Sequence, residues 1–327
     1  MGDVAKLAGV SHQTVSRVLN VPGAVRPATR ARVEQAIATL GYRRNTAARS
    51  LVTRRSETIG VLAFDNTTLY GPASTLAGIE SGAREAGFYC SVVSVPVPSP
   101  AAVLEAADRL LAQSVEGIIV IAPQQEAAAA VAALPAELAV VVAEGGPVDG
   151  LSRAGIDQEQ GASELVRHML SMGHRTVHHL AGPSSWAEAV GRTAGWASAL
   201  AASGRTAPPV LTGDWTPMSG YRAVLDLDLT DVTALFVAND QMALGALRAL
   251  HERDVRVPEQ VSVAGFDDIP EAAFFSPPLT TVRQDFEQLG LQSVELLLAR
   301  VGEGARVTSV TLAPEVVQRA SVSNPPF

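Results

Sequence analysis

The stretch DVAKLAGVSHQTVSRVLN, from Asp3 to Asn20, decides how the start of this chain folds. An Ala-rich amphipathic helix is predicted to end at Gly9, and a second helix to begin at Ser11, a residue type that caps helix N-termini well. The apolar side chains that can form one small core are Val4, Leu7, Ala8, Val10, Val15, Val18 and Leu19. Helix, short glycine turn and helix make the unit that lays its second helix in the major groove of DNA.

The residues between the apolar positions of the second helix are uniformly polar. His12, Gln13, Thr14, Ser16 and Arg17 can all form hydrogen bonds, and Gln and Arg suit the edges of adenine and guanine. A helical hairpin without a ligand has no use for so unmixed a polar face. We therefore expect these side chains, together with that of Asn20, to contact DNA.

Charge is divided unevenly along the 327 residues. The net charge of −8 alone argues against nucleic-acid binding, yet residues 1–58 hold ten basic side chains against three acidic ones. This head therefore carries +7 and the remainder −15. A basic head on an acidic body is typical of a small DNA-binding domain fused to a domain that does not bind DNA. Phosphate repels the body, so DNA contacts are expected in the head alone.

The length of 327 residues fits two or three domains, and a composition of 47% hydrophobic and 18% charged residues is that of a globular protein. Cys90 is the only cysteine, which excludes an intramolecular disulfide. Its surroundings, FYCSVVSV at 88–95, predict a buried strand with Cys90 as a small core residue. No signal peptide opens the chain and no apolar run is long enough to span a membrane, which predicts a soluble cytoplasmic protein.

A third helix is predicted over 28–40, between a Pro/Gly loop at 20–27 and Gly41. The segment that follows, RRNTAARSLVTRRS at 43–56, is rich in arginine and small residues and has one large apolar side chain, Leu51. Two interpretations fit it. It is a solvated linker, or it is a short hinge helix that folds on DNA and pushes Leu51 into the minor groove.

Beyond Glu57 apolar runs alternate with helical segments. The runs lie at 58–64, 88–95, 117–122, 138–144, 176–182, 233–240 and 261–268. The helical segments lie at about 73–86, 101–113, 126–133, 158–172, 187–202, 219–229 and 240–254. This alternation predicts an α/β fold with parallel sheets covered on both faces, and the number of strands favours two similar lobes over one sheet.

Polar side chains follow several predicted strands, at the sheet edge where α/β proteins bind ligands. Asn239-Asp240 and Asp267-Asp268 end two strands, Arg192 lies on the helix after a third, and Trp215 lies in a loop. Each has a structural explanation, because Asn239 and Asp268 could cap helices and Trp215 could be core. Together they offer the hydrogen bonds and the apolar platform that a polyhydroxylated ring needs. We expect a small-molecule site there.

The quoted head motif, the third helix, ARSL at 48–51 and the body together resemble the LacI-type bacterial transcriptional repressors along essentially the whole chain. The segments LAGPSS (180–185), GDWTPMSGY (213–221), VANDQMALGALRAL (237–250) and PPLTTVRQDF (277–286) point to the subgroup of the family's namesake. The resemblance implies a three-helix helix-turn-helix head at 1–43, a hinge helix at 44–56 and a two-lobed, periplasmic-binding-protein-like core at 57–327. Lobe 1 would span about 57–157 and 285–314, and lobe 2 about 158–284 and 315–327.

The resemblance also implies residue roles. His12, Gln13 and Arg17 fall where the recognition helix reads bases, and Leu51 falls on the intercalating leucine of the hinge. Arg192, Asn239 and Asp267 fall on residues that hold sugar hydroxyls, and Trp215, Gln284 and Phe286 on further pocket positions. The implied partners are pseudo-palindromic double-stranded operator DNA, a small galactoside-like sugar and a second copy of the chain, with no cofactor, metal or membrane.

Several departures from the family pattern bear on these roles. The chain begins abruptly at Met1, which suggests a start codon further upstream, and Arg49 adds a charge in the hinge that we expect to contact DNA. The chain ends at Phe327 without a leucine-heptad tail, which favours a dimer over a dimer of dimers. The strand end at 64–66 and Gln124-Gln125 also differ, so the sugar is left open.

Three other functions compete with this interpretation. An enzyme is disfavoured because the nucleophile-elbow, P-loop, zinc-protease and dinucleotide-binding motifs are all absent from the sequence. His178 and His179 lie in a predicted strand and fit a core or edge position better than a ligand, and Asp267-Asp268 fits one ligand contact plus one cap better than an acid/base pair. A periplasmic sugar-binding protein would lack the basic head. A constitutive repressor, or one with a non-sugar effector, stays open.

Overall fold

The computed structural model describes residues 1–20, 23, 25–42, 56–64, 69–122, 124–303 and 306–326. The chain separates into two compact units, Met1–Ser56 and Glu57–Phe327, which we call the head and the core. In the described part of the chain, no helix is both long and apolar enough to cross a bilayer.

The head contains the helices α1 (Gly2–Ala8), α2 (His12–Asn20) and α3 (Pro27–Thr39), in close agreement with the predicted helices. Gly9 ends α1 in the left-handed conformation, with φ of 63°. Ser11 caps α2, because its hydroxyl accepts a hydrogen bond from the amide of Thr14 at 3.2 Å. Helix, glycine turn and helix are therefore formed as the sequence predicts.

The small core of the head is made by side chains from all three helices: Val4, Ala5, Ala8, Val15, Val33 and Ala36. Val10, Val18 and Leu19 pack against it. Leu7 does not belong to this core, since it is 54% exposed, and that part of the prediction was wrong. The buried face of α1 is centred on Val4, Ala5 and Ala8, and helical periodicity leaves Leu7 on its flank.

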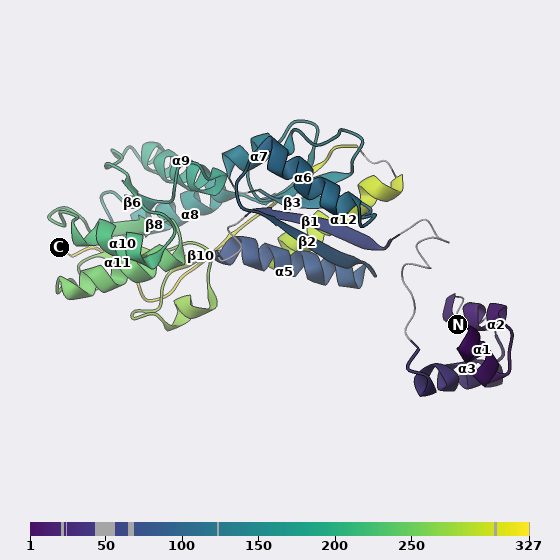
Figure 1. The fold of residues 1–327 in the computed structure, drawn as a ribbon. Coiled ribbons are helices and arrows are strands. Elements are labelled where there is room, and N and C mark those ends of the chain that lie inside the picture. Colours follow the sequence, from purple (N-terminus) through teal and green to yellow (C-terminus); the bar gives the residue numbers. More distant parts are fainter. Residues whose placement is uncertain are drawn as a thin grey trace. The chain divides into compact units, whose positions relative to one another are not determined.

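The core contains two lobes, each with its own parallel sheet (Figure 1). Lobe 1 has six strands in the order β11-β5-β4-β3-β1-β2. Their bounds are β1 Thr58–Phe64, β2 Tyr89–Val95, β3 Ile118–Ile121, β4 Val140–Ala143, β5 Ser152–Ile156 and β11 Ser309–Leu312. Helices α6 (Pro100–Leu111) and α7 (Gln125–Val131) pack on one face of the sheet, and α5 (Tyr70–Glu85) and α12 (Phe286–Glu303) pack on the other.

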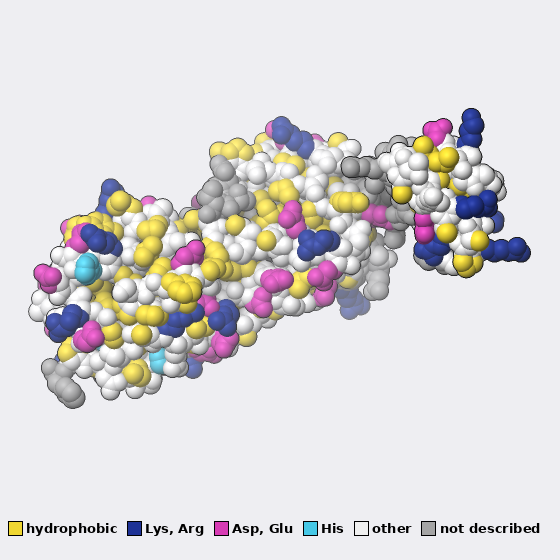
Figure 2. Space-filling view, turned by 90° about the horizontal axis from the view of Figure 1, so that it is seen from below, with side chains coloured by type: hydrophobic (Ala, Val, Ile, Leu, Met, Phe, Trp, Pro, Cys, Tyr) yellow, Lys and Arg dark blue, Asp and Glu magenta, His cyan; other side chains and the backbone are white. Residues whose placement is uncertain are grey.

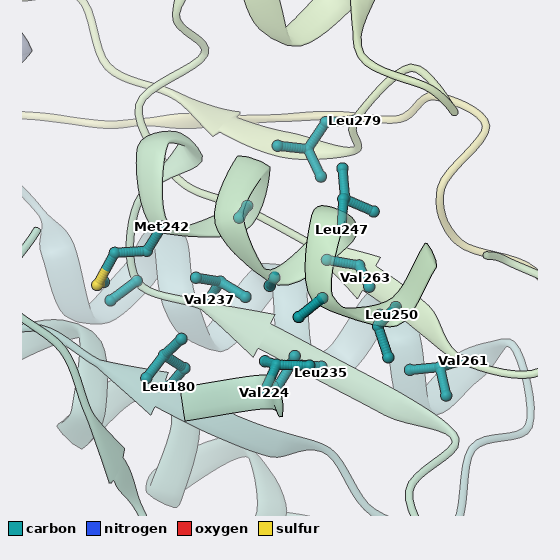
Figure 3. Close-up of a cluster of buried hydrophobic side chains, with 14 of the residues drawn as sticks. Leu180, Val224, Leu235, Val237, Met242, Leu247, Leu250, Val261, Val263 and Leu279 are labelled. Carbon is teal, nitrogen blue, oxygen red and sulfur yellow. The ribbon is translucent and has the colours of Figure 1, made fainter. Parts of the chain in front are cut away.

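Lobe 2 has four strands in the order β7-β6-β8-β9. Their bounds are β6 His178–Ala181, β7 Leu211–Thr212, β8 Ala234–Val237 and β9 Ser262–Ala264. Helices α8 (Gln158–Ser171) and α9 (Ala187–Ala202) cover one face, and α10 (Pro217–Leu225) and α11 (Asp240–Glu252) cover the other. Figure 3 shows Met242 and Leu250 of α11 on the side of Leu235 and Val237 of β8, and Leu247 of the same helix directed toward Leu279.

The chain passes between the lobes more than once. It leaves lobe 1 after β5 and returns after β10 (Thr281–Arg283), which pairs antiparallel with β12 (Glu315–Val317). After α12 and β11 it enters lobe 2 again through β12, and a short 3-10 helix, η1 (Pro270–Phe274), lies between β9 and β10. The two crossings that begin α8 and end β10 bring sequence-distant polar residues together between the lobes.

The prediction of a buried strand around Cys90 was wrong in one respect. The strand exists as β2, but it lies at the edge of its sheet, with Tyr89 62% and Val92 41% exposed. An edge strand has a neighbour on one side alone, so its apolar residues are not all covered. Cys90 is half-buried, and burial followed by the charge of Glu80 raises the pKa of its thiol to about 11.

Candidate functional site

The outer face of α2 presents the predicted DNA-reading residues. His12, Gln13 and Arg17 are exposed, whereas Thr14 and Ser16 are half-buried. The Thr14 hydroxyl lies 2.9 Å from that of Ser11, so it takes part in the helix start. The side chain of Asn20, and all of Arg49 and Leu51, lie outside the described residues.

Basic side chains of the described head are exposed, as Figure 2 shows for the face in view. They are Lys6, Arg17, Arg26, Arg30 and Arg32. Arg30 forms an ion pair with Glu34 at 2.8 Å on α3. Exposed Lys and Arg side chains around a recognition helix provide the phosphate contacts that position such a helix on DNA.

A cavity of about 410 Å³ lies between the two lobes of the core. All six predicted pocket residues line it: Arg192, Trp215, Asn239, Asp267, Gln284 and Phe286. The cavity is also lined by Tyr70, Glu144, Arg153, Gln158 and Glu188, for which the sequence analysis made no prediction. Its wall thus comes from both lobes and from the segments that join them.

Four of the lining side chains form a closed ring of polar contacts. Arg192 Nε donates to Gln158 Oε1 at 2.8 Å, and Gln158 Nε2 donates to Gln284 Oε1 at 2.7 Å. Gln284 Nε2 donates to Asp267 Oδ1 at 2.7 Å, and Arg192 Nη2 lies 3.3 Å from the same oxygen. Each side chain in the ring fixes the next, which holds the donors and acceptors of the cavity in place.

Asp267 is the titratable centre of this ring. It follows β9 with a backbone φ of 114°, which residues other than glycine rarely adopt. The residue is 7% exposed. Burial raises the pKa of its carboxyl to about 6, although Arg192 and Gln284 both favour the ionised form. A ligand hydroxyl that donates to this carboxylate would compensate part of the cost of burying it.

Arg192 is held by more than the ion pair. Its Nη1 donates to the carbonyl of Ala238 at the end of β8, and its guanidinium lies 4.1 Å from the ring centre of Phe266 and 5.5 Å from that of Trp215. The fixed guanidinium is placed by α9, which begins directly after the loop that follows β6.

Asn239 caps α11 as well as lining the cavity. Its Oδ1 accepts from the amide of Met242 at 2.9 Å, and its Nδ2 donates to the Trp215 carbonyl at 3.1 Å and to Gln241 Oε1 at 2.8 Å. Asn239 is therefore both the helix cap and a pocket residue, the two roles that its sequence position suggested. Its cap also fixes the Trp215 loop against the start of α11.

The aromatic wall has two edge-to-face pairs. Trp215 packs against Trp186 with ring centres 5.6 Å apart, and Phe286 packs against Tyr70 at 5.8 Å. Trp215 is 6% exposed and belongs to a hydrophobic cluster of lobe 2, so it is core and pocket wall together. Its indole N–H has no hydrogen-bond partner among the described residues.

Asp268 does not cap a helix, so that prediction was wrong. Its carboxylate accepts from Arg283 Nε at 2.8 Å and from Arg319 Nη2 at 2.6 Å. The helix after it, η1, begins after Ile269 without a side-chain cap. Positive φ values at both aspartates turn the chain so that Asp268 faces the β10–β12 ribbon while Asp267 faces the cavity.

The two strand histidines, His178 and His179, begin β6 in lobe 2. His179 is fully buried, stacks on Phe236 with ring centres 4.5 Å apart, and has its two ring nitrogens 3.1 Å from the Phe236 carbonyl and 3.2 Å from the Thr193 hydroxyl. Among the residues described, no group of three or more His, Cys, Asp or Glu side chains is arranged to hold a metal ion.

A helix-turn-helix head with a two-lobed α/β core and a polar cavity between the lobes defines a DNA-binding transcriptional regulator with an effector-binding core. Residues 1–45 match the family model described as bacterial regulatory proteins, lacI family, and residues 166–322 match a periplasmic binding protein-like domain. The chain belongs to the lacI family of bacterial regulatory proteins, which confirms the resemblance seen in the sequence.

Individual relatives agree along nearly the whole chain. The lactose operon repressor of Escherichia coli (strain K12) is 38% identical over 99% of this chain and 90% of its own length. The transcriptional regulator CelR of Thermobifida fusca is 35% identical over 97% of this chain and 96% of its own. The crystal structure of the lac repressor dimer bound to operator and the anti-inducer ONPF matches with a TM-score of 0.86 at 36% identity, covering 98% of each chain.

Proposed function

We propose that this protein is a sugar-responsive repressor that binds a pseudo-palindromic operator as a homodimer in the cytoplasm. A small sugar in the cavity between the lobes would lower its affinity for the operator. The proposal rests above all on the ring of Arg192, Gln158, Gln284 and Asp267, which offers fixed donors and acceptors beside an aromatic wall. Vicinal hydroxyls and an apolar ring face are the features that such a wall recognises.

The size of the cavity supports a small ligand. Its volume of about 410 Å³ lies within the range of small-molecule sites, roughly 300–1,000 Å³. Two related structures support the ligand class, since one is a lac repressor dimer with operator and anti-inducer and another is a CelR–cellobiose complex with a TM-score of 0.72. The relatives are repressors and regulators, which favours a regulatory role over a catalytic one.

We assign the working parts as residues 1–43 for DNA reading, 44–56 for the hinge and 57–327 for effector binding and dimerisation. His12, Gln13 and Arg17 would read bases, and Arg49 and Leu51 would act in the hinge, with Leu51 as a minor-groove wedge. Two heads related by a two-fold axis would read two inverted half-sites. The sugar would favour a lobe arrangement that does not hold the paired hinges at operator spacing.

The decisive experiment is a calorimetric sugar titration of the full chain, with and without an operator obtained by in vitro selection. Linkage requires that operator weaken sugar binding by the factor by which sugar weakens operator binding. Lower sugar affinity with operator, and no change with a scrambled duplex, is the expected result. Equal affinity in all three titrations would reject the inducer role and leave a constitutive repressor or a non-sugar effector, and higher affinity with operator would make the sugar a co-repressor.

A further inference from the structure

Two carboxyl side chains from opposite lobes meet at the cavity. Glu144 follows β4 of lobe 1, and Glu188 lies in the first turn of α9 in lobe 2. Glu188 Oε1 accepts a hydrogen bond from the backbone amide of Gly145 at 2.7 Å, which places it beside Glu144. Both side chains line the cavity. The pair therefore joins the lobes at the cavity, near enough to Arg192 for its charge to oppose the rise in pKa that burial causes in both carboxyls.

No described Lys or Arg forms an ion pair with Glu144 or Glu188 within 4.0 Å, although the charges of Arg192 and Arg153 oppose the rise in the pKa of Glu188 that burial causes. The cavity holds two arginines, and Arg192 uses its donors on Asp267, Gln158 and Ala238. Arg153 donates through Nε to the Gly145 carbonyl at 2.8 Å. The ion pairs of the described chain within 4.0 Å include neither Glu144 nor Glu188. The cavity is thus lined by five carboxyl residues, Glu144, Asp157, Glu159, Glu188 and Asp267, against two guanidinium groups, an excess of three negative charges when all are ionised.

Two polar atoms at the cavity lack a partner. Glu188 Oε2 is a buried acceptor without a hydrogen bond, and Trp215 Nε1 is a buried donor without one, counting partners in the described part of the chain. Trp215 is more than nine-tenths buried and lines the cavity. Each atom has less than 1 Å² of accessible surface, so its side chain has to turn before a ligand can reach it. Burying a polar group without a hydrogen bond is costly, so a ligand that then supplies a donor to Glu188 or an acceptor to Trp215 would gain affinity.

The protonation of the pair responds to a bound cation. Burial raises the pKa of Glu144, and the charge of Glu188 raises it further, while the Thr75 hydroxyl opposes this by donating to Glu144 Oε1 at 2.5 Å. Burial also raises the pKa of Glu188. A positive group between them would favour ionisation of both, because opposite charges nearby stabilise the charged form.

We propose that Glu144 and Glu188 bind the protonated amine of an amino-sugar effector. This deepens the proposed function and rests on it, since the ring hydroxyls of the same sugar would bind at Arg192 and Asp267. The ammonium group supplies up to three donors, enough for both carboxylates and for the otherwise unpaired Glu188 Oε2. A neutral sugar would supply a hydroxyl there without charge assistance.

The test compares matched sugars on the full chain by calorimetry at pH 7. The probes are D-galactosamine, D-galactose and N-acetyl-D-galactosamine, and the corresponding three sugars of the gluco series. In at least one series the amine is expected to bind about tenfold or more tightly than its neutral and acetylated analogues, as charge-assisted hydrogen bonds require. Glu188→Gln and Glu144→Gln should each remove that preference, because they keep the shape of the side chain and cannot take up the negative charge that a bound ammonium favours.

Glu126→Gln is the matched control, since Glu126 is an exposed acidic residue of α7 that does not line the cavity, and it should keep the amine preference. Equal or tighter binding of the neutral sugars by the unmodified protein would overturn the amine site and leave the sugar-responsive repressor standing. A preference that survives in Glu188→Gln would overturn it as well. If none of the six sugars binds, the proposed sugar function fails together with the amine site. The unmodified protein decides the first comparison even where a variant does not fold.

Discussion

Gln158 donates a hydrogen bond to Gln284 at 2.7 Å, although 126 positions separate the two residues in the chain. Gln158 begins α8 directly after one crossing between the lobes, and Gln284 follows β10 at the next. The same two side chains connect Arg192 to Asp267. A ligand that binds Arg192 or Asp267 therefore acts on the segments that join the lobes, which is where a change in lobe arrangement has to be accommodated.

Asp267→Asn should lower sugar affinity without destabilising the empty core. The variant keeps the shape of the side chain but removes the charge-assisted acceptor, worth about 1.5–3 kcal/mol to a bound hydroxyl. The pKa of Asp267 is raised to about 6 by burial, so ionisation disfavours the folded state above that pH. At pH 7.5 the variant should thus be more stable than the unmodified protein by on the order of 1–3 kcal/mol.

The stability difference between Asp267→Asn and the unmodified protein should depend on pH. A carboxyl whose pKa is raised on folding costs stability above its folded pKa, and this cost disappears below the unfolded pKa of about 3.9. The stability gap between variant and unmodified core should therefore narrow as the pH falls from about 6 towards 4. Denaturant unfolding at several pH values measures it. A variant that is less stable at pH 7.5 would show that Arg192 stabilises the ionised carboxylate by more than burial disfavours it.

Gly182→Ala should disturb the aromatic wall of the cavity. A Cβ atom at Gly182, directly after β6, would overlap the six-membered ring of Trp215. The indole would have to move, at a cost in stability of about 1–3 kcal/mol, and the sugar would lose its platform. Gly302→Ala is the control, because a Cβ there would have no atom within 4 Å and the residue does not line the cavity. Unchanged thermal stability and sugar affinity in Gly182→Ala would contradict the rigid Trp215 position.

Much of the fold could be predicted because its signals are local. Continuous Val, Ile and Ala runs became β1, β3, β4 and β8, and Gly9 and Ser11 set the turn of the head. The strands β5, β7, β10, β11 and β12 were not predicted, since they are short and carry no long apolar run. Their places depend on the lobe crossings, which leave no periodic pattern in the sequence.

The cavity was predicted in part for the same reason. Asn239 and Asp267 end strands, which is a signal that a sequence shows. Glu144 carries the same signal, because it ends the run at 138–144. Glu188 and Gln158 have no such signal, since each lies in the first turn of a helix and reaches the cavity because the two lobes face each other. Only the three-dimensional arrangement brings them together.

Arg17→Ala should weaken operator binding by roughly 1–3 kcal/mol per half-site and relax specificity at one base position. Arg17 is exposed on α2, and its planar guanidinium suits a guanine edge. Arg17→Lys is the matched variant, because it keeps the charge and loses the two-pronged hydrogen bond. Fluorescence anisotropy on the operator, on single-base variants and on random DNA measures both the affinity and the base specificity. Equal losses on every duplex would make Arg17 a phosphate contact rather than a base contact.

His179 should lower the unfolding free energy of the core as the pH falls from about 6.5 to 4. Asp267 has the opposite effect over part of this pH range. Burial lowers the pKa of His179 to about 4, from an unfolded value of about 6.5. Between these values the unfolded chain binds a proton that the folded core does not, so the unfolding free energy falls as the pH falls. The contribution at pH 4 is on the order of 2–3 kcal/mol, whereas Asp267 gains stability over much of the same range.

Comparing the unmodified core with His179→Asn isolates the histidine. Asn does not titrate and keeps a hydrogen-bonding group near the Phe236 carbonyl or the Thr193 hydroxyl, though it loses the stacking on Phe236. The variant should start out less stable at pH 7.5, and its deficit should shrink steadily as the pH falls from 6.5 to 4. A deficit that is constant over this range would mean that His179 titrates alike in the folded and unfolded chains, and NMR titration of the ring would then place its pKa near 6.5 instead of near 4.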